Sequence, residues 1–261
     1  MCEARGYAPD HAGHLYTNMT KRVFICFRCG WKGRLDPENV PFVPTHLIQK
    51  SVEGGLVSRE RNMQDSGIRL LPTEPETRVQ ARMLEYLSRR NVNVGMVRTW
   101  KLMYAAHGTY ANRVVFPCFG DLGIEYFVAR AIDPGVEPKT LHPPKNGLWP
   151  GKSEVLWGIE RVEPGGSIVL CEGVFDAAVI PNGVALLGKY ISMRQMQMVA
   201  LRASRIVIAL DGDAHNEALE IYSKIRRTYP RMNIATIILP RDKDPADLGP
   251  DAMYDKVREY L

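Results

Sequence analysis

Two stretches of sequence decide the fold, residues 167–173, SIVLCEG, and residues 205–213, RIVIALDGD. Each begins as a short apolar run of strand length and ends on acidic residues. A third apolar run, NIATIIL, covers residues 233–239, and stretches of helical pattern separate the runs at 176–180, 193–201 and 217–229. Apolar strands that alternate with helices predict a parallel sheet covered on both faces.

Acidic residues follow all three apolar runs. They are Glu172 and Asp176 after the first run, Asp211 and Asp213 after the second, and Asp242, Asp244 and Asp247 after the third. Ligands of an open α/β sheet bind outside the carboxyl ends of its strands. We therefore expect three acidic clusters to converge on one edge of the sheet.

Carboxylates this close together would repel one another and raise their own pKa values. A divalent cation resolves that conflict, and Mg²⁺ prefers carboxylates together with waters and substrate phosphates. Two such ions can stabilise the attacking and the leaving oxygen of an in-line phosphoryl transfer. Gly173 and Gly212 suit such a site, because backbone close to a metal or a phosphate cannot carry a bulky Cβ. The pattern predicts a metal site.

Changes of pattern divide the rest of the chain. Residues 1–35 are rich in cysteine, histidine and aromatic residues, and residues 36–76, with their prolines and glycines, are expected to form a linker. Residues 77–163 form a third segment, and Pro164-Gly165-Gly166 marks the break before the parallel-sheet segment, residues 164–261. We expect these four segments to be the structural divisions of the chain.

The third segment opens with apolar residues at three- and four-residue steps, which predict a helix from Thr77. Two strand-like runs follow, at 113–117 and 124–130, with glycines at the two ends of residues 120–123 between them. This arrangement predicts a β-hairpin.

The amino-terminal segment carries the zinc-knuckle signature Cys26-Phe27-Arg28-Cys29-Gly30. A structural zinc ion takes four ligands in a tetrahedral array, so two more must come from Cys2, His11 and His14. A redox pair is the alternative, but such a pair opens a helix, whereas this one follows the strand-like residues 23–25. The spacing favours one structural Zn²⁺.

Bulk composition is that of a globular protein. The chain has 261 residues, a formal net charge of +5 and a pI of about 8.9, which permits a polyanionic partner without requiring one. The sequence contains no apolar run long enough to span a membrane and no secretory h-region. The five cysteines are an odd number, and with no export signal we expect a reducing, cytoplasmic compartment.

The acidic pattern resembles a known domain. Glu172-Gly173-x-x-Asp176, then Asp211-Gly212-Asp213, then residues 243–247, KDPAD, are similar to the Toprim domain of DnaG-type primases, topoisomerases, RecR-like repair proteins and OLD-type nucleases. The resemblance implies that Glu172, Asp211 and Asp213 bind two Mg²⁺ or Mn²⁺ ions. Asp176, Asp244 and Asp247 would complete the catalytic acidic cluster.

The upstream half resembles DnaG-type primases. The similar segments, in order, are residues 112–117, NRVVFP; 129–132, ARAI; 138–141, PKTL; and 156–159, LWGI. The resemblance implies a groove for template and nucleotide phosphates, lined by Arg113, Arg130, Lys139 and Lys152. Cationic side chains suit phosphates, and we place Arg113 and Arg130 at matching positions of the hairpin.

For the zinc module, the resemblance selects Cys2, His14, Cys26 and Cys29 as ligands, with His11 as the substitute for His14. The expected fold class is α/β, or α+β overall. It comprises an N-terminal zinc ribbon and a mixed α+β subdomain that leads into a Toprim Rossmann-like parallel sheet.

The implied function is DNA primase, a nucleotidyltransferase that makes short RNA primers on single-stranded DNA from ribonucleoside triphosphates. Topoisomerases need further large domains, RecR-like proteins lack the basic lead-in, and OLD-type nucleases carry a P-loop that is missing here. Two alternatives stay open: a Toprim-type metal-dependent nuclease, or a non-catalytic single-stranded-DNA-binding replication factor.

The sequence ends at Leu261, directly after the Toprim-like segment. The resemblance therefore implies a compact form encoded by a bacteriophage or mobile element and acting in a bacterial cell. A replicative helicase would then be a separate protein.

Overall fold

The computed structural model describes residues 15–18, 23–26, 32–34, 58–120 and 123–261. The chain forms two compact units, Met1–Gly54 and Gly55–Leu261, and each is treated by itself. No helix in the described ranges has the length and apolar character to cross a membrane.

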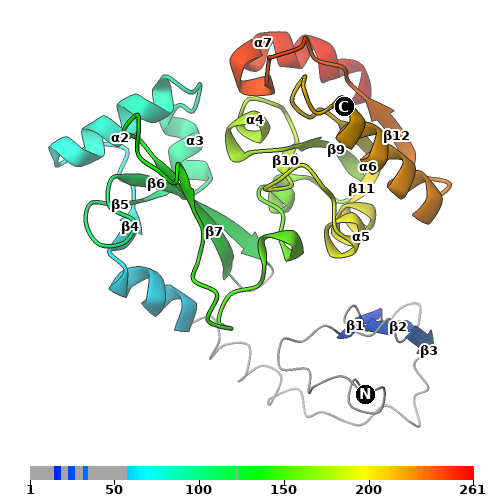
Figure 1. Cartoon of the computed structure of the whole chain (residues 1–261), viewed down its shortest axis with the longest axis horizontal. Coiled ribbons are helices and arrows are strands. Elements are labelled where there is room, and N and C mark those ends of the chain that lie inside the picture. Colours follow the sequence, from blue (N-terminus) through cyan, green and yellow to red (C-terminus); the bar gives the residue numbers. More distant parts are fainter. Residues whose placement is uncertain (1–14, 19–22, 27–31, 35–57, 121–122) are drawn as a thin grey trace. The chain divides into compact units, whose positions relative to one another are not determined.

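The first unit contains a small antiparallel sheet of three strands, in the order β1-β2-β3 (Figure 1). The strands are β1 (Leu15–Asn18), β2 (Val23–Cys26) and β3 (Lys32–Arg34). The strand expected before the Cys26 pair is therefore confirmed, and Cys26 is its last residue. The other zinc-ligand predictions, Cys2, His11, His14 and Cys29, lie outside the described residues.

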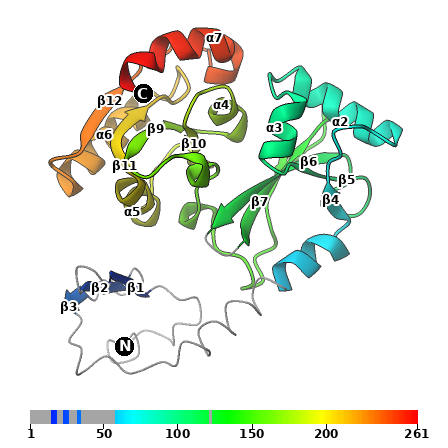
Figure 2. The same cartoon turned by 180° about the vertical axis from the view of Figure 1, so that it is seen from behind.

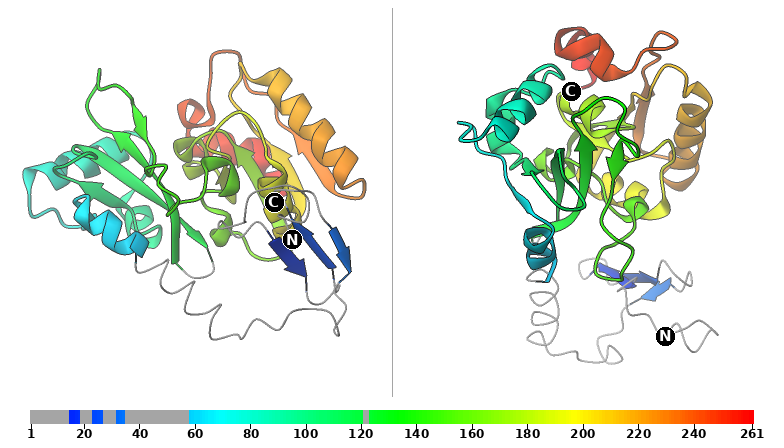
Figure 3. Two further views of the ribbon diagram at one scale, coloured as in Figure 1. Left: turned by 60° about the horizontal axis from the view of Figure 1, so that its bottom comes forward. Right: turned by 60° about the vertical axis from the view of Figure 1, so that its left-hand side comes forward.

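The first half of the second unit, coloured cyan to green in Figure 3, contains an antiparallel sheet. Its strand order is β4-β5-β6-β7-β8. Its strands are β4 (Ile68–Leu70), β5 (Met103–Ala105), β6 (Arg113–Gly120), β7 (Gly123–Ala131) and β8 (Thr140–Leu141). Strands β6 and β7 pair along their whole length, which confirms the predicted hairpin.

Two helices belong to this half. Helix α2 (Arg78–Ser88) begins where the sequence predicts, because Thr77 and Gln80 form a reciprocal capping box. Helix α3 (Val94–Thr99) starts at Asn93, whose side chain accepts a hydrogen bond from the Met96 amide at 3.0 Å.

The predicted linker, residues 36–76, is too long. Residues 58–65 are helical and β4 follows, while residues 36–57 lie outside the described part. Met63, Ile68 and Leu71 are all buried. The glycines and prolines of this segment suggested an open chain, but these apolar side chains hold it against the sheet.

The second half is a four-stranded parallel sheet in the order β10-β9-β11-β12, as the alternating pattern predicts. Its strands are β9 (Gly166–Cys171), β10 (Gly183–Ala185), β11 (Ala203–Ile208) and β12 (Asn233–Thr236). Two of the expected strands run too far, because β11 ends at Ile208 and β12 at Thr236, although the Ala209 and Ile237 amides each still donate to a neighbouring chain. The segments that follow these two strands lead the chain to the acidic residues.

Helices cover both faces of the parallel sheet (Figures 1 and 2). Helices α5 (Met193–Arg202) and α6 (His215–Thr228) pack on the face that presents Ile168, Leu170 and Ile206. Helices α4 (Val174–Ala178) and α7 (Pro245–Val257) belong to the opposite face. Both faces are therefore buried, as the continuous apolar runs require.

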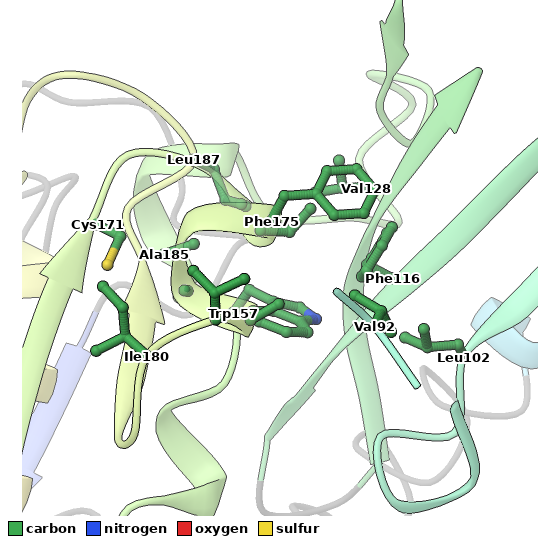
Figure 4. Packing of buried hydrophobic residues seen from close by; sticks show 14 of the residues in the cluster. Val92, Leu102, Phe116, Val128, Trp157, Cys171, Phe175, Ile180, Ala185 and Leu187 are labelled. Atoms are coloured by element: carbon green, nitrogen blue, oxygen red, sulfur yellow. The ribbon is translucent and has the colours of Figure 1, made fainter. Parts of the chain in front are cut away.

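One hydrophobic core joins the two halves of this unit (Figure 4). Phe116 from β6 meets Phe175 from α4 edge-to-face, with ring centroids 5.1 Å apart, and it meets Trp157 at 5.7 Å. Trp157 is 1% exposed. Truncating such a buried aromatic costs about 3–5 kcal/mol, so this contact is a main restraint on how the two sheets face each other.

Candidate active site

The acidic residues after β9 and β11 meet at one edge of the parallel sheet. Glu172 follows β9 directly, and the Ala209 amide donates to the Leu170 carbonyl at 2.9 Å, which keeps the two chains side by side beyond the strand ends. Asp211 comes two residues after Ala209. The expected convergence of Glu172 and Asp211 is therefore present.

A cavity of about 390 Å³ lies at this edge. Its acidic lining consists of Glu172, Asp176, Asp211 and Asp244, and its basic lining consists of Arg90, Arg130 and Lys152. The cavity therefore presents carboxylates and cationic side chains to the same space, the acids from the parallel-sheet half and two of the cations from the antiparallel half.

Two of the cavity's acids are held by helix starts. Asp176 Oδ2 accepts a hydrogen bond from the Gly173 amide at 2.9 Å, at the start of α4. Asp244 Oδ1 accepts one from the Asp247 amide at 2.6 Å, at the start of α7. Carboxylates are favoured at helix amino termini, so both positions have a structural reason as well as a chemical one.

Burial and mutual repulsion raise the pKa values of these carboxyl groups. Burial, followed by the charges of Asp211 and Asp244, raises the pKa of Asp176 to about 7. Burial and then Asp244 raise the pKa of Asp211 to about 6. The pKa of Glu172 is also raised, by burial first and by Asp211 next. Full ionisation of the cluster near neutral pH is therefore energetically unfavourable.

A divalent cation fits this cluster. Among the described residues, no group donates a hydrogen bond to the buried Oε2 of Glu172 or the buried Oδ1 of Asp211. Two orphaned carboxylate oxygens beside each other are what a cation would satisfy. In the described ranges, however, no three acidic, histidine or cysteine side chains already form a cluster able to hold a metal. Waters or substrate phosphates would have to complete the coordination.

A smaller hollow of about 210 Å³ adjoins the cavity and contains the other predicted acids. Asp211 and Asp244 line both spaces, while Asp213 and Asp247 line only the smaller one. Asp213 and Asp247 are exposed. The six predicted acids are thus brought together as one continuous group, but in two adjoining hollows.

The role of Gly212 differs from the expected one. A Cβ at this position would lie 2.0 Å from the Pro240 carbonyl oxygen, and the Gly212 amide donates to the Lys243 carbonyl at 2.9 Å. The glycine is needed because the 240–243 loop packs against its backbone. It thereby holds Asp211 and Asp213 next to the segment that carries Asp244.

Of the predicted basic residues, the structure places Arg130 and Lys152 in the cavity. Arg130 Nη1 donates to Thr140 Oγ1 at 3.0 Å, which directs the guanidinium from β7 along β8. Lys139 is exposed and does not line the cavity.

Arg113 is not where a phosphate ligand is expected. It is 5% exposed, and its Nη1 and Nη2 donate to the carbonyls of Lys139 and Pro138 at 3.1 and 2.9 Å. The hairpin register pairs Arg113 with Ala131, and Arg130 with Val114. The two arginines are therefore one position out of step and lie on opposite faces of the sheet, so the expected matching positions are wrong.

Three residues of the site were not singled out from the sequence. Arg90 lines the cavity, with its guanidinium 5.3 Å from the Phe175 ring. His142 also lines it, with its ring centroid 5.8 Å from that of Tyr126 and the two rings tilted by 34°, and burial lowers the pKa of its imidazole. Lys189 Nζ lies 3.6 Å from Asp213 Oδ2. Each is an isolated residue in a helix end or loop, which gives no sequence signal.

Comparison with known proteins finds relatives that are named DNA primase. The chain is 29% identical over 153 residues to a DNA primase of Legionella pneumophila, covering 53% of this chain and 26% of that protein. It is 25% identical over 236 residues to a DNA primase of Listeria innocua, covering 82% of this chain and 37% of that protein. This chain therefore spans well under half of each relative. No protein-family model matches the sequence.

Solved structures share the fold. A DnaG primase catalytic domain bound to single-stranded DNA superposes with a TM-score of 0.63 at 17% identity, over 83% of both chains. The zinc-binding and RNA polymerase domains of the Aquifex aeolicus primase superpose with a TM-score of 0.51 at 18% identity, over 97% of this chain and 76% of that one. The resemblance to DnaG-type primases that the sequence motifs indicate is thus confirmed, in sequence by the curated relatives and in fold by the solved catalytic domains.

Proposed function

We propose that this chain is a DNA primase that joins ribonucleotides into short RNA primers on a single-stranded DNA template. One observation carries the proposal: a single cavity presents orphaned carboxylate oxygens from Glu172 and Asp211 together with cationic groups from Arg130 and Lys152. A metal-bound nucleoside triphosphate needs both kinds of group at one place. The sequence relatives named DNA primase support the same reaction class.

In this proposal the parallel-sheet half is a Toprim domain, and Glu172, Asp211 and Asp213 hold Mg²⁺ or Mn²⁺. When bound, such ions stabilise the attacking and leaving oxygens of nucleotidyl transfer. Asp176, Asp244 and Asp247 add negative charge behind these ligands. Asp244 and Asp176 also fix the starts of α7 and α4, so they position the segments that flank the metal ligands.

The cationic residues position substrate. Arg130 and Lys152 would bind nucleotide phosphates inside the cavity, and the exposed Lys139 would bind the template backbone outside it. Arg113 acts through its two hydrogen bonds, because it fixes the 138–139 backbone on which Lys139 stands. It is a positioning residue and not a phosphate ligand.

The amino-terminal unit is proposed to be a zinc ribbon that binds single-stranded template, with Cys2, His14, Cys26 and Cys29 as the zinc ligands. The short three-stranded sheet of this unit supports the proposal, because so few residues rarely form a stable core without a metal. The zinc-binding domain named in the Aquifex aeolicus structure offers a parallel. A bacteriophage source, a cytoplasmic site of action and a replicative helicase as partner are parts of the same proposal.

Primer synthesis is the test. The protein is incubated with random-sequence single-stranded DNA, labelled ribonucleotides and Mg²⁺ or Mn²⁺, beside the variants Asp211→Asn and Lys256→Gln. Wild type and Lys256→Gln should give short RNA, and Asp211→Asn should give none while still binding DNA. DNA degradation without RNA would favour a nuclease, and intact DNA without RNA would favour a binding factor.

A further inference from the structure

Lys189 lies at the acidic edge of the parallel sheet although no step of the proposed reaction uses it. Its Nζ is 3.6 Å from Asp213 Oδ2, and their side chains are 37% and 60% exposed. Nearby carboxylates, Glu172 most of all, raise the pKa of its ammonium group. The ammonium is therefore a cation already present among the residues proposed to bind metal.

The backbone that carries Lys189 is held on both sides. Before it, the Leu186 amide donates to the Cys171 carbonyl at 2.9 Å, and Leu187 takes the left-handed conformation with φ 61°. After it, Lys224 Nζ donates to the Ile191 carbonyl at 2.6 Å. The long side chain of Lys189 can therefore move its ammonium while the flanking backbone at Leu186 and Ile191 stays in place.

An ammonium group and a divalent ion compete for the same carboxylate oxygens. A lysine supplies one positive charge and three donors, which partly satisfies crowded carboxylates while the metal is absent. A divalent ion brings two positive charges to Asp213, but it must first separate the ion pair between Lys189 and Asp213. Charges that share one site within a few ångströms repel, so the lysine weakens metal binding at that site.

We propose that Lys189 is the built-in counter-cation of the metal site, and that the divalent ion binds Asp213 only by displacing the Lys189 ammonium. This inference rests on the proposed metal-dependent function and concerns how that site is regulated. Displacement requires only rotation of the lysine side chain. The protein therefore keeps its carboxylates partly neutralised without metal and has a higher metal requirement than a site without the lysine.

The experiment measures the Mn²⁺ affinity of the full chain by electron paramagnetic resonance, in the absence of nucleotide and template. Lys189→Gln removes the charge and keeps a polar side chain. It should bind Mn²⁺ about two- to tenfold more tightly than wild type, the range expected for an exposed ion pair beside a divalent ion. Lys189→Arg should stay within about twofold of wild type. The matched control is Lys256→Gln, which removes an exposed lysine charge from the last turn of α7 and should not alter affinity.

A double-mutant cycle with Asp213→Asn locates the effect. In the Asp213→Asn background, Lys189→Gln should gain clearly less affinity than in wild type. Equal Mn²⁺ affinity of wild type and Lys189→Gln, or an equal gain in both backgrounds, would overturn the counter-cation role while leaving the proposed function intact. Mn²⁺ binding to wild type that is undetectable, or indifferent to Asp211→Asn, would instead overturn the proposed metal site and this inference with it.

Discussion

Replacing Arg113 by methionine tests whether this arginine supports the backbone or binds a phosphate. The guanidinium donates to the carbonyls of Pro138 and Lys139, and the residue is 5% exposed. Methionine has a similar length but no donor, so two carbonyls lose their partners. Charged hydrogen bonds contribute about 1.5–3 kcal/mol each, and part of the loss is recovered where water reaches the carbonyls. We expect the free energy of unfolding to fall by about 2–4 kcal/mol.

Thermal unfolding followed by circular dichroism measures this loss. For a unit of this size, 1 kcal/mol corresponds to a Tm change of about 2–4 °C, so Arg113→Met should lower the Tm by roughly 5–15 °C. The matched variant is Arg130→Met, whose guanidinium donates to the Thr140 hydroxyl. It should change the Tm by no more than about 4 °C. It should also raise the KM for ribonucleotides by tenfold or more, which is what a charged phosphate contact usually contributes to binding.

The two variants therefore differ in which quantity they change. If Arg113→Met folds as stably as wild type and raises the KM for ribonucleotides as Arg130→Met does, Arg113 does not support the 138–139 backbone. Arg113 would then reach phosphate directly, as its sequence context first suggested.

Three further predictions follow from the buried groups. Since the pKa of Asp176 is raised to about 7, metal-free protein should lose stability as pH rises from about 4 to 7. Asp176→Asn should make this loss smaller in urea titrations at several pH values, and the remainder should come from Asp211 and Glu172, whose pKa values are also raised. An unchanged pH profile would contradict the assignment. Gly212→Ala should weaken Mn²⁺ binding by tenfold or more, because its Cβ would lie 2.0 Å from the Pro240 carbonyl oxygen; calorimetry showing wild-type affinity would disprove this. Arg161→Leu should alter tryptophan fluorescence and destabilise the fold by about 1–3 kcal/mol. The reason is that Arg161 Cζ lies 3.9 Å from the ring centroid of Trp157 and 4.5 Å from that of Trp100. Unchanged emission and stability would count against these contacts.

The parallel sheet and its acidic edge could be predicted because both depend on local pattern. Apolar runs of strand length identify buried strands, and parallel strands bring their carboxyl ends to the same edge. Glu172 and Asp211 therefore meet as expected. The pattern does not reveal where a strand stops, so residues 237–239, apolar like a strand, were expected to continue β12 and do not.

Register and loop position could not be predicted in the same way. A shift of one residue turns a side chain to the other face, so Arg113 and Arg130 look equivalent in sequence and are not. The helix at 58–65 was not predicted, because the neighbouring glycines and prolines suggest a linker. Lys189 is one lysine in a loop, and only the folded chain places it beside Asp213.

The positions of bound metal and nucleotide would show whether this cavity is the catalytic site. Crystals of the full chain grown with Mn²⁺ and a non-hydrolysable ribonucleoside triphosphate analogue would be measured at a wavelength where manganese scatters anomalously. Manganese peaks are expected at Glu172 and Asp211, with the triphosphate lying between these peaks and the side chains of Arg130 and Lys152. Manganese bound elsewhere, or a nucleotide held outside this cavity, would contradict it.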